Sequence, residues 1–152
     1  MAEKVIIIGG TAAGLSAASK AKRVDPSLEI TVFERSGYIS YGACGLPYFV
    51  GGIIDQPDDL VSLNVDQMTN QRGVPTFIHH EVTSIDRTAQ TVTVRDLDSG
   101  KSWQQPYDKL VIATGARAIV PDIPGADAEG VYTLRTCLLY TSPSPRDRSL
   151  SR

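Results

Sequence analysis

The chain has 152 residues, of which 41% are hydrophobic and 21% are charged, and its formal net charge is −2. This composition is typical of one globular domain, and the weakly acidic charge excludes a strongly basic nucleic-acid-binding surface. Because no apolar run approaches the roughly 20 residues that span a bilayer, and the start of the chain is too short and too acidic for a secretory signal, we expect no membrane association and a cytoplasmic protein.

The first third of the chain reads as strand, helix and strand. The apolar run "KVIIIGG" (Lys4–Gly10) predicts a strand buried on both faces of a parallel sheet. Small residues and helix formers follow, and they predict a helix that ends at Asp25–Pro26. The segment "EITVFE" (Glu29–Glu34) predicts a second strand that ends in an acid.

The turn between the first strand and the helix carries three glycines. Gly9 and Gly14 occupy the first and third positions of the dinucleotide pattern G-x-G-x-x-G, and Thr11 takes the second, just after Gly10. The pattern predicts a pyrophosphate at the helix N-terminus, with Glu34 accepting hydrogen bonds from a ribose diol. The alternatives are a glycine-rich turn without a ligand and, for Glu34, an ordinary solvated acid.

The middle of the chain predicts mostly short elements. Residues 58–74 predict a strand or turn and then a helix that ends at Gly73. The segments 76–86, 91–100 and 102–109 predict an antiparallel meander. His79 and His80 would point to opposite faces of its first strand, so we expect no metal site there.

The later part of the chain predicts one more buried strand, "KLVIATG", in which Thr114 and Gly115 let the backbone approach a ligand. The proline-containing segment after it predicts an exit from the sheet. Residues 137–152 hold three arginines and one aspartate, and "CLLYTSPSPRD" in this tail resembles a translated sequencing adapter. We therefore interpret the tail as non-native, so that Cys137 has no biological role. The alternative is a disordered basic tail.

Cys44 lies in the stretch "SYGACGLPYF" (Ser40–Phe49). The small neighbours Gly42, Ala43 and Gly45 leave space around its sulfur. The residues "CGLPYFV" predict a short helix, whose N-terminus favours the thiolate that attacks disulfides. The alternative is a buried structural cysteine. Two cysteines do not make a disulfide framework.

Four segments together resemble the flavin-dependent pyridine nucleotide–disulfide oxidoreductases, within the group of coenzyme A-disulfide reductases, NADH oxidases and peroxidases. The segments are "VIIIGGTAAGLSAA", "SYGACGLPYFVGG", "EVTSID" and "YDKLVIATGA…IPG". The resemblance implies an α/β fold: a truncated, Rossmann-like FAD-binding domain with a parallel sheet, helices and a small antiparallel β-meander. Residues 1–125 would be the N-terminal part of this domain, and residues 126–136 would start the crossover to a missing NAD(P)H domain. The parent would be a homodimer through a missing C-terminal domain.

The resemblance also implies the residues of the site. Classical members carry a second cysteine where this chain has Phe49, so Cys44 would be a single redox cysteine beside the flavin. Arg23 and Ser40 match residues of coenzyme A-linked members, although Arg23 is equally explained as a solvated helix residue and Ala43 replaces a common asparagine. The residues expected to bind FAD are Gly9, Gly10, Thr11, Ala12, Ala13, Gly14, Glu34, Arg35, Val82, Thr114 and Gly115.

The expected reaction is NAD(P)H-driven reduction of coenzyme A disulfide, or of a related small disulfide or polysulfide, through FAD and Cys44. An NADH oxidase-type flavoenzyme is the first alternative. Ala12 stands where the resemblance places a histidine in the peroxidase and oxidase branch, which argues against peroxide as the specialised substrate. A nucleotide-binding module without redox chemistry is the second alternative, and a non-functional truncation product is the third. The truncated chain is not expected to be active alone.

Overall fold

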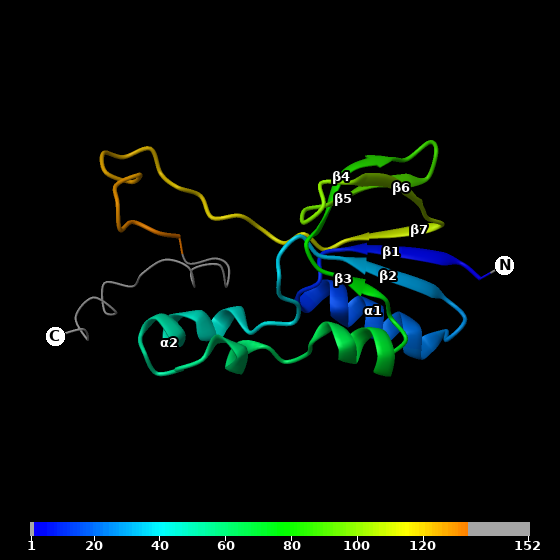
Figure 1. The fold of residues 1–152 in the computed structure, drawn as a ribbon, viewed down its shortest axis with the longest axis horizontal. Helices are drawn as coiled ribbons and strands as arrows, with labels where there is room; N and C mark the ends of the chain where they lie inside the picture. The colour runs from blue at the N-terminus through cyan, green and yellow to red at the C-terminus, as the bar shows by residue number, and fades with distance from the viewer. Residues whose placement is uncertain (1, 134–152) are drawn as a thin grey trace. The chain divides into compact units, whose positions relative to one another are not determined.

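The computed structural model describes residues 2–133, which divide into two units (Figure 1). Residues 2–41 and 63–115 form the sheet unit, and residues 42–62 and 116–133 form the cysteine unit. The predictions for residues 137–152, including Cys137, lie outside the described residues.

The sheet unit is built on four parallel strands in the order β3-β2-β1-β7. These are β1 (Lys4–Ile8), β2 (Glu29–Phe33), β3 (Thr76–Phe77) and β7 (Lys109–Ile112), and helix α1 (Ala12–Val24) connects β1 to β2. The predicted strand–helix–strand order is confirmed. The first strand ends directly before Gly9, whose φ of 108° no regular strand accommodates, and the last strand ends at Ile112, three residues before Gly115.

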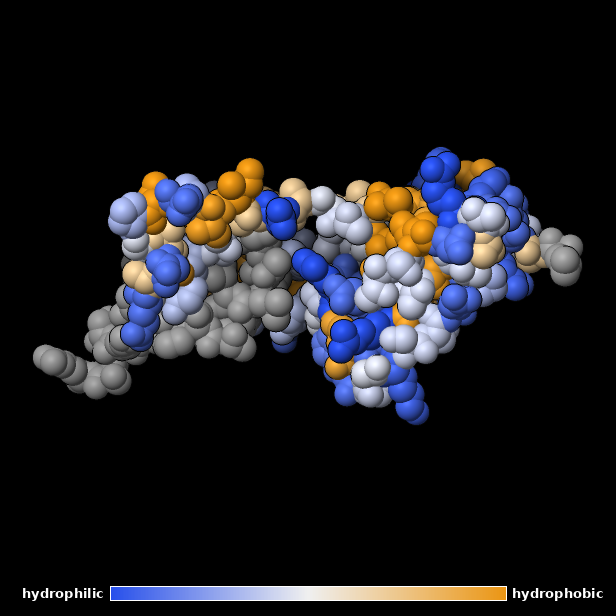
Figure 2. Space-filling view, turned by 90° about the horizontal axis from the view of Figure 1, so that it is seen from above, coloured by the Kyte–Doolittle hydropathy of each residue, from blue (hydrophilic) through white to orange (hydrophobic). Residues whose placement is uncertain are grey.

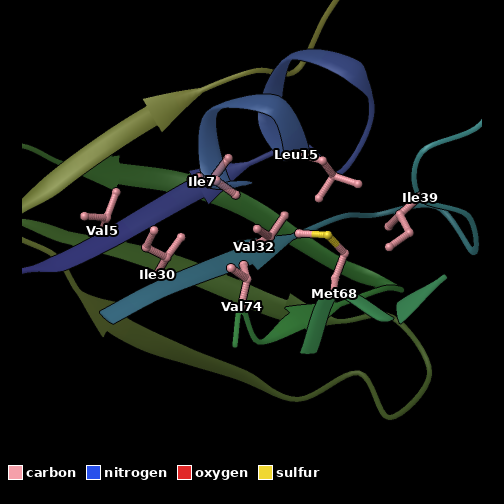
Figure 3. Packing of buried hydrophobic residues seen from close by; sticks show 9 residues of the cluster. Val5, Ile7, Leu15, Ile30, Val32, Ile39, Met68 and Val74 are labelled. Atoms are coloured by element: carbon pink, nitrogen blue, oxygen red, sulfur yellow. The ribbon is translucent and has the colours of Figure 1, made fainter. Parts of the chain in front are cut away.

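Apolar side chains cover both faces of this sheet. Val5 and Ile7 of β1 point to the face that carries α1, while Ile6 and Ile8 point to the opposite face. This arrangement explains why β1 is a continuous apolar run rather than an alternating one. Figure 3 shows the core on the α1 side, which comprises Val5, Ile7, Leu15, Ala18, Ile30, Val32, Ile39, Met68 and Val74.

The opposite face packs against an antiparallel meander of β4 (His80–Asp86), β5 (Thr91–Asp96) and β6 (Ser102–Pro106). Val92 and Val94 of β5 are fully buried there with Phe33. The meander was predicted, but its first segment was wrong at residues 76–79. The structure places β3 in the parallel sheet instead, and His79, with a φ of 56°, turns the chain toward β4.

The two histidines therefore do not share a strand. His79 lies before β4, so alternation along a strand does not decide where its ring points. Among the described residues, no group of three histidine, cysteine or acidic side chains is arranged to hold a metal ion.

The remaining elements are short. The sheet unit contains the π-helical turn η3 (Gln67–Gln71), and Gly73 ends that segment with a φ of 64°, as the sequence predicted. The cysteine unit contains η1 (Ala43–Gly45), α2 (Leu46–Val50) and η2 (Pro57–Leu60). No helix in residues 2–133 combines the length and the apolar character that crossing a membrane requires.

Hydrophobic side chains also lie at the surface of both units, as Figure 2 shows for one face. The segment after β7 has no helix or strand up to residue 133 and exposes Ile119, Val120 and Ile123. The prediction that this proline-containing segment leaves the sheet is therefore confirmed.

Candidate functional site

The loop from Gly9 to Gly14 is held so closely that its glycines have no room for side chains. The Gly9 N–H donates to the Phe33 carbonyl at 2.8 Å, and a Cβ on Gly9 would lie 2.4 Å from the Ala113 carbonyl oxygen. A Cβ on Gly14 would lie 1.9 Å from the Gly9 carbonyl oxygen. The first turn of α1 therefore lies directly on the end of β1, and glycine is required at both positions.

The N-terminus of α1 is open to an anion. Thr11 is the N-cap residue, but its side chain makes no capping hydrogen bond, and the first turn carries no acidic side chain. Ala12 and Ala13 in that turn are exposed and small. Because the first N–H groups of a helix have no intrahelical acceptors and the helix dipole is positive at this end, a pyrophosphate fits this terminus.

Glu34 lies just after β2, and its carboxylate is fixed by two backbone donors. Its Oε2 accepts the Gly10 N–H at 2.7 Å, and its Oε1 accepts the Ser36 N–H at 2.8 Å. The residue is only 8% exposed. Each carboxylate oxygen keeps a second lone pair, which suits the hydroxyls of a ribose diol. Glu34 is therefore not an ordinary solvated acid.

The structure brings Thr114 and Ser40 to this loop, whereas Arg35 and Val82 lie outside it. The Thr114 nitrogen lies 3.4 Å from the Cβ position of Gly9, and Gly115 follows it. The Ser40 N–H donates to the Gly10 carbonyl at 3.0 Å. Arg35 is exposed directly after Glu34. Val82 lies in β4, where its side chain packs against the core beneath the meander.

Arg23 lies at the other end of α1 from the glycine loop. Its Nε donates to the Ser19 carbonyl at 3.3 Å, while Arg72 donates from Nη1 to the Ser19 hydroxyl at 3.1 Å. Ser19 thus anchors both arginines, here called the arginine pair, one through its carbonyl and one through its hydroxyl. A guanidinium group suits a phosphate. The sequence did not point to Arg72, since no local pattern connects it with α1 across 53 positions.

Cys44 lies in the cysteine unit, in the turn η1, and its thiol is free and exposed. The Gly42 N–H donates to the Leu60 carbonyl at 2.7 Å, and the Gly45 N–H donates to the Gly42 carbonyl at 2.8 Å. The predicted short helix is present as α2, although Cys44 lies in the turn before it. The exposure excludes the alternative of a buried structural cysteine.

Comparison with known proteins gives a consistent result. The family model described as "Pyridine nucleotide-disulphide oxidoreductase" matches residues 3–144. The chain is 35% identical to the coenzyme A disulfide reductase of Staphylococcus haemolyticus over 132 residues, which are 87% of this chain and 29% of that protein. It is 38% identical to an NADH oxidase of Enterococcus faecalis over 128 residues, or 84% of this chain and 28% of that protein.

A solved structure shares the fold. The NAD-dependent persulfide reductase of A. fulgidus superposes with a TM-score of 0.83 at 41% identity, over 89% of this chain and 25% of that one. The chain thus spans less than a third of the length of the S. haemolyticus and E. faecalis relatives.

Proposed function

The chain belongs to the pyridine nucleotide–disulphide oxidoreductase family, and we propose that it is the N-terminal part of a FAD-dependent enzyme that reduces a small disulfide with NAD(P)H. The observation that carries this proposal is the glycine loop closed by the buried, doubly hydrogen-bonded Glu34. Residues 1–125 contribute to the FAD-binding domain, and residues 126–136 lead toward a nicotinamide domain of the longer parent.

The sheet unit has the residues to hold the adenosine diphosphate half of FAD. The N-terminal turn of α1, from Thr11 to Gly14, binds the pyrophosphate, and Glu34 binds the ribose. Arg35, Val82, Thr114 and Gly115 are the further contact residues that we propose. When bound, FAD supplies the redox chemistry between the nicotinamide and the sulfur.

Cys44 is the residue that reacts with the substrate. Its thiolate attacks one sulfur of coenzyme A disulfide, so that a Cys44–coenzyme A disulfide forms and the other coenzyme A leaves as a thiolate. Reduction of this mixed disulfide by two electrons releases the second coenzyme A and restores the Cys44 thiolate. The exposed position of Cys44 supports this role, because a bulky disulfide must reach the sulfur.

Coenzyme A as the substrate is supported by the name of the S. haemolyticus relative and by the arginine pair. Arg23 and Arg72 bind a phosphate of coenzyme A, and Ser40 is a further substrate contact. A direct check is the affinity of the chain for coenzyme A, which Arg72→Ala should reduce. Arg87→Ala, which removes an exposed arginine between β4 and β5, should leave it unchanged. If Arg72→Ala and Arg87→Ala changed the affinity for coenzyme A equally, the arginine pair would not be its phosphate site.

An NADH oxidase-type activity is the second candidate, favoured by the similarity to the E. faecalis protein. In that case Cys44 would cycle through a sulfenic acid rather than a coenzyme A disulfide. Trapping of the sulfenic acid with a dione reagent, set against the mass of a coenzyme A adduct, separates the two candidates.

The experiment that tests the proposed function is the absorption spectrum of the purified chain mixed with FAD, before and after dithionite. We expect a bound, shifted flavin spectrum and a long-wavelength band that disappears in Cys44→Ser. A shifted spectrum that does not respond to Cys44→Ser would indicate a nucleotide-binding module without redox chemistry. A spectrum identical to that of free FAD would show that this chain alone holds no flavin site, as expected of a non-functional truncation product.

A further inference from the structure

His79 connects two turns of the sheet unit that lie far apart in the sequence. Its N–H donates to the Ser36 carbonyl at 3.2 Å, and its own carbonyl accepts the Leu97 N–H at 2.8 Å. Its φ of 56° is uncommon for a residue other than glycine. A residue stays in such a conformation when its surroundings hold it there, and such residues cluster at ligand-binding sites.

The His79 ring is fixed on two sides. Its Nδ1 lies 3.0 and 3.1 Å from the two carboxylate oxygens of Asp98, so Nδ1 donates to that carboxylate. On the other side, the position of a Cβ on Gly37 would lie 2.7 Å from the His79 Nε2. The imidazole therefore occupies the space that a side chain at position 37 would need.

Gly37 belongs to the turn that holds Glu34. Its neighbour Ser36 donates its N–H to the Glu34 Oε1 at 2.8 Å. The backbone N–H of His80, the residue after His79, donates to the Glu34 carbonyl at 2.9 Å. Contacts thus run from Asp98 through the His79 ring and Gly37 to the turn that orients the Glu34 carboxylate.

We propose that His79, held by Asp98, is a positioning residue for Glu34: its ring packs on Gly37 and fixes the turn of residues 35–38, so that the carboxylate is aligned for a ribose diol. The proposal rests on the role that the proposed function gives to Glu34. Asp98 is itself held in place, because its N–H donates to the Asp96 Oδ1 at 2.9 Å.

If His79 and Asp98 served only the stability of the whole fold, loss of their contact would destabilise the core rather than loosen one turn. The side chains of His79 and Asp98 are 42% and 73% exposed, and exposed ion pairs add little to global stability. Loss of the ring should therefore loosen the turn of residues 35–38 while the core strands stay protected.

The test is amide hydrogen exchange of the whole chain without ligand, read at the Ser36 N–H. His79→Asn tolerates the positive φ and keeps a donor for Asp98, but it removes the ring from Gly37. We expect the Ser36 amide to exchange roughly five- to tenfold faster, the change expected when one hydrogen bond is lost.

The Gly9 amide, bonded to Phe33 in the sheet, is the internal reference and should not change. Gln90→Asn is the matched control at another positive φ, 51°, and should change neither amide.

Gly37→Ala tests the contact from the other side. In the wild-type background its Cβ displaces the His79 ring and should speed Ser36 exchange, whereas in His79→Asn the same substitution should have little further effect. Coupled effects support the proposal, and strictly additive effects at the two positions would overturn it.

Titration of FAD separates this proposal from the proposed function. Faster Ser36 exchange together with a roughly five- to tenfold weaker FAD affinity supports both. Faster exchange in a chain that does not bind FAD supports the positioning role and counts against the proposed function alone. Unchanged Ser36 exchange in His79→Asn overturns the positioning role, whatever the flavin affinity.

Discussion

The glycine loop (residues 9–14) and the cysteine segment (residues 42–45) are both short, rich in glycine and uncharged, yet they are held differently. In the glycine loop, the places where side chains would begin at Gly9 and Gly14 are blocked by backbone carbonyls at 2.4 and 1.9 Å. In the cysteine segment, the nearest atom to a Cβ on Gly42 is 3.7 Å away, which is an ordinary contact. The atom nearest to a Cβ on Gly45 is the end of the Leu60 side chain, at 2.4 Å. A flexible side chain can move aside, whereas the backbone carbonyls at the glycine loop cannot do so without moving the chain.

This difference follows from what each region would do in the proposed function. A loop that binds phosphate through its N–H groups needs a rigid backbone, and backbone-to-backbone contacts provide that rigidity. A cysteine that exchanges disulfides needs an exposed sulfur. Its segment is fastened by a backbone hydrogen bond from Gly42 to Leu60, which leaves the thiol in solvent.

The largest expected effect is that of Gly14→Ala on folding. The new Cβ would meet the Gly9 carbonyl oxygen, and this backbone atom moves only if the strand end moves. We expect the free energy of unfolding to fall by about 3 kcal/mol, the upper part of the usual range for overpacking. That loss exceeds the roughly 1 kcal/mol by which alanine favours a helix over glycine.

The matched variant Gly42→Ala should change the unfolding free energy by less than about 0.5 kcal/mol, as substitutions away from packed sites do. Urea unfolding followed by circular dichroism compares the two variants. If Gly14→Ala and Gly42→Ala lowered the free energy of unfolding by similar amounts, the glycine loop would not be more tightly packed than the cysteine segment.

The second prediction concerns the thiol. In a Cys137→Ser background, coenzyme A disulfide should add one coenzyme A to the native chain, and Cys44→Ser should abolish the adduct without changing the unfolding midpoint. The reason is that Cys44 is exposed while the segment depends on backbone hydrogen bonds. Intact mass spectrometry gives the result, and an adduct that forms only after denaturation would contradict the exposed position.

The smallest expected effect lies in the turn that holds Asp98. A hydrogen bond from the Ser99 hydroxyl, and then one from the Asp98 N–H, holds the pKa of Asp96 below its ordinary value of 3.8. These hydrogen bonds to the Asp96 carboxylate therefore stabilise the folded chain. Their contribution is complete above pH 3.8, where Asp96 would also be ionised in the unfolded chain. It is lost as the pH falls through the lower pKa that Asp96 has in the folded chain. In Ser99→Ala the pKa of Asp96, followed by carboxyl NMR shifts, should move up toward 3.8. A downward or absent shift would show that the Ser99 hydroxyl is not the main cause.

The sequence predicted those parts of the molecule that depend on local patterns. β1, α1, β2 and the acid after β2 follow from apolar runs, helix formers and glycine spacing. The boundary between β3 and the meander was missed, because it depends on the positive φ of His79, and histidine does not predict such a conformation.

The residues that support the site were harder to predict. Arg72 meets α1 through Ser19, and Asp98 meets His79, but both contacts depend on how distant segments pack. The role of the Ser36 N–H in holding Glu34 involves a backbone group, which leaves no signal in the residue type.

The most direct test of the central claim is the dissociation constant of FAD for Glu34→Gln, compared with Glu29→Gln. Glu29 begins the same strand and is exposed, so its substitution should leave the affinity unchanged. Glu34→Gln removes the charge from a carboxylate that accepts two backbone bonds, and the affinity should fall at least about tenfold, the size expected for hydrogen bonds to a charged group. Unfolding midpoints of the two variants show whether the chain stays folded. Equal affinities for FAD in folded Glu34→Gln and Glu29→Gln would contradict the assignment of the glycine loop and Glu34 as the nucleotide site.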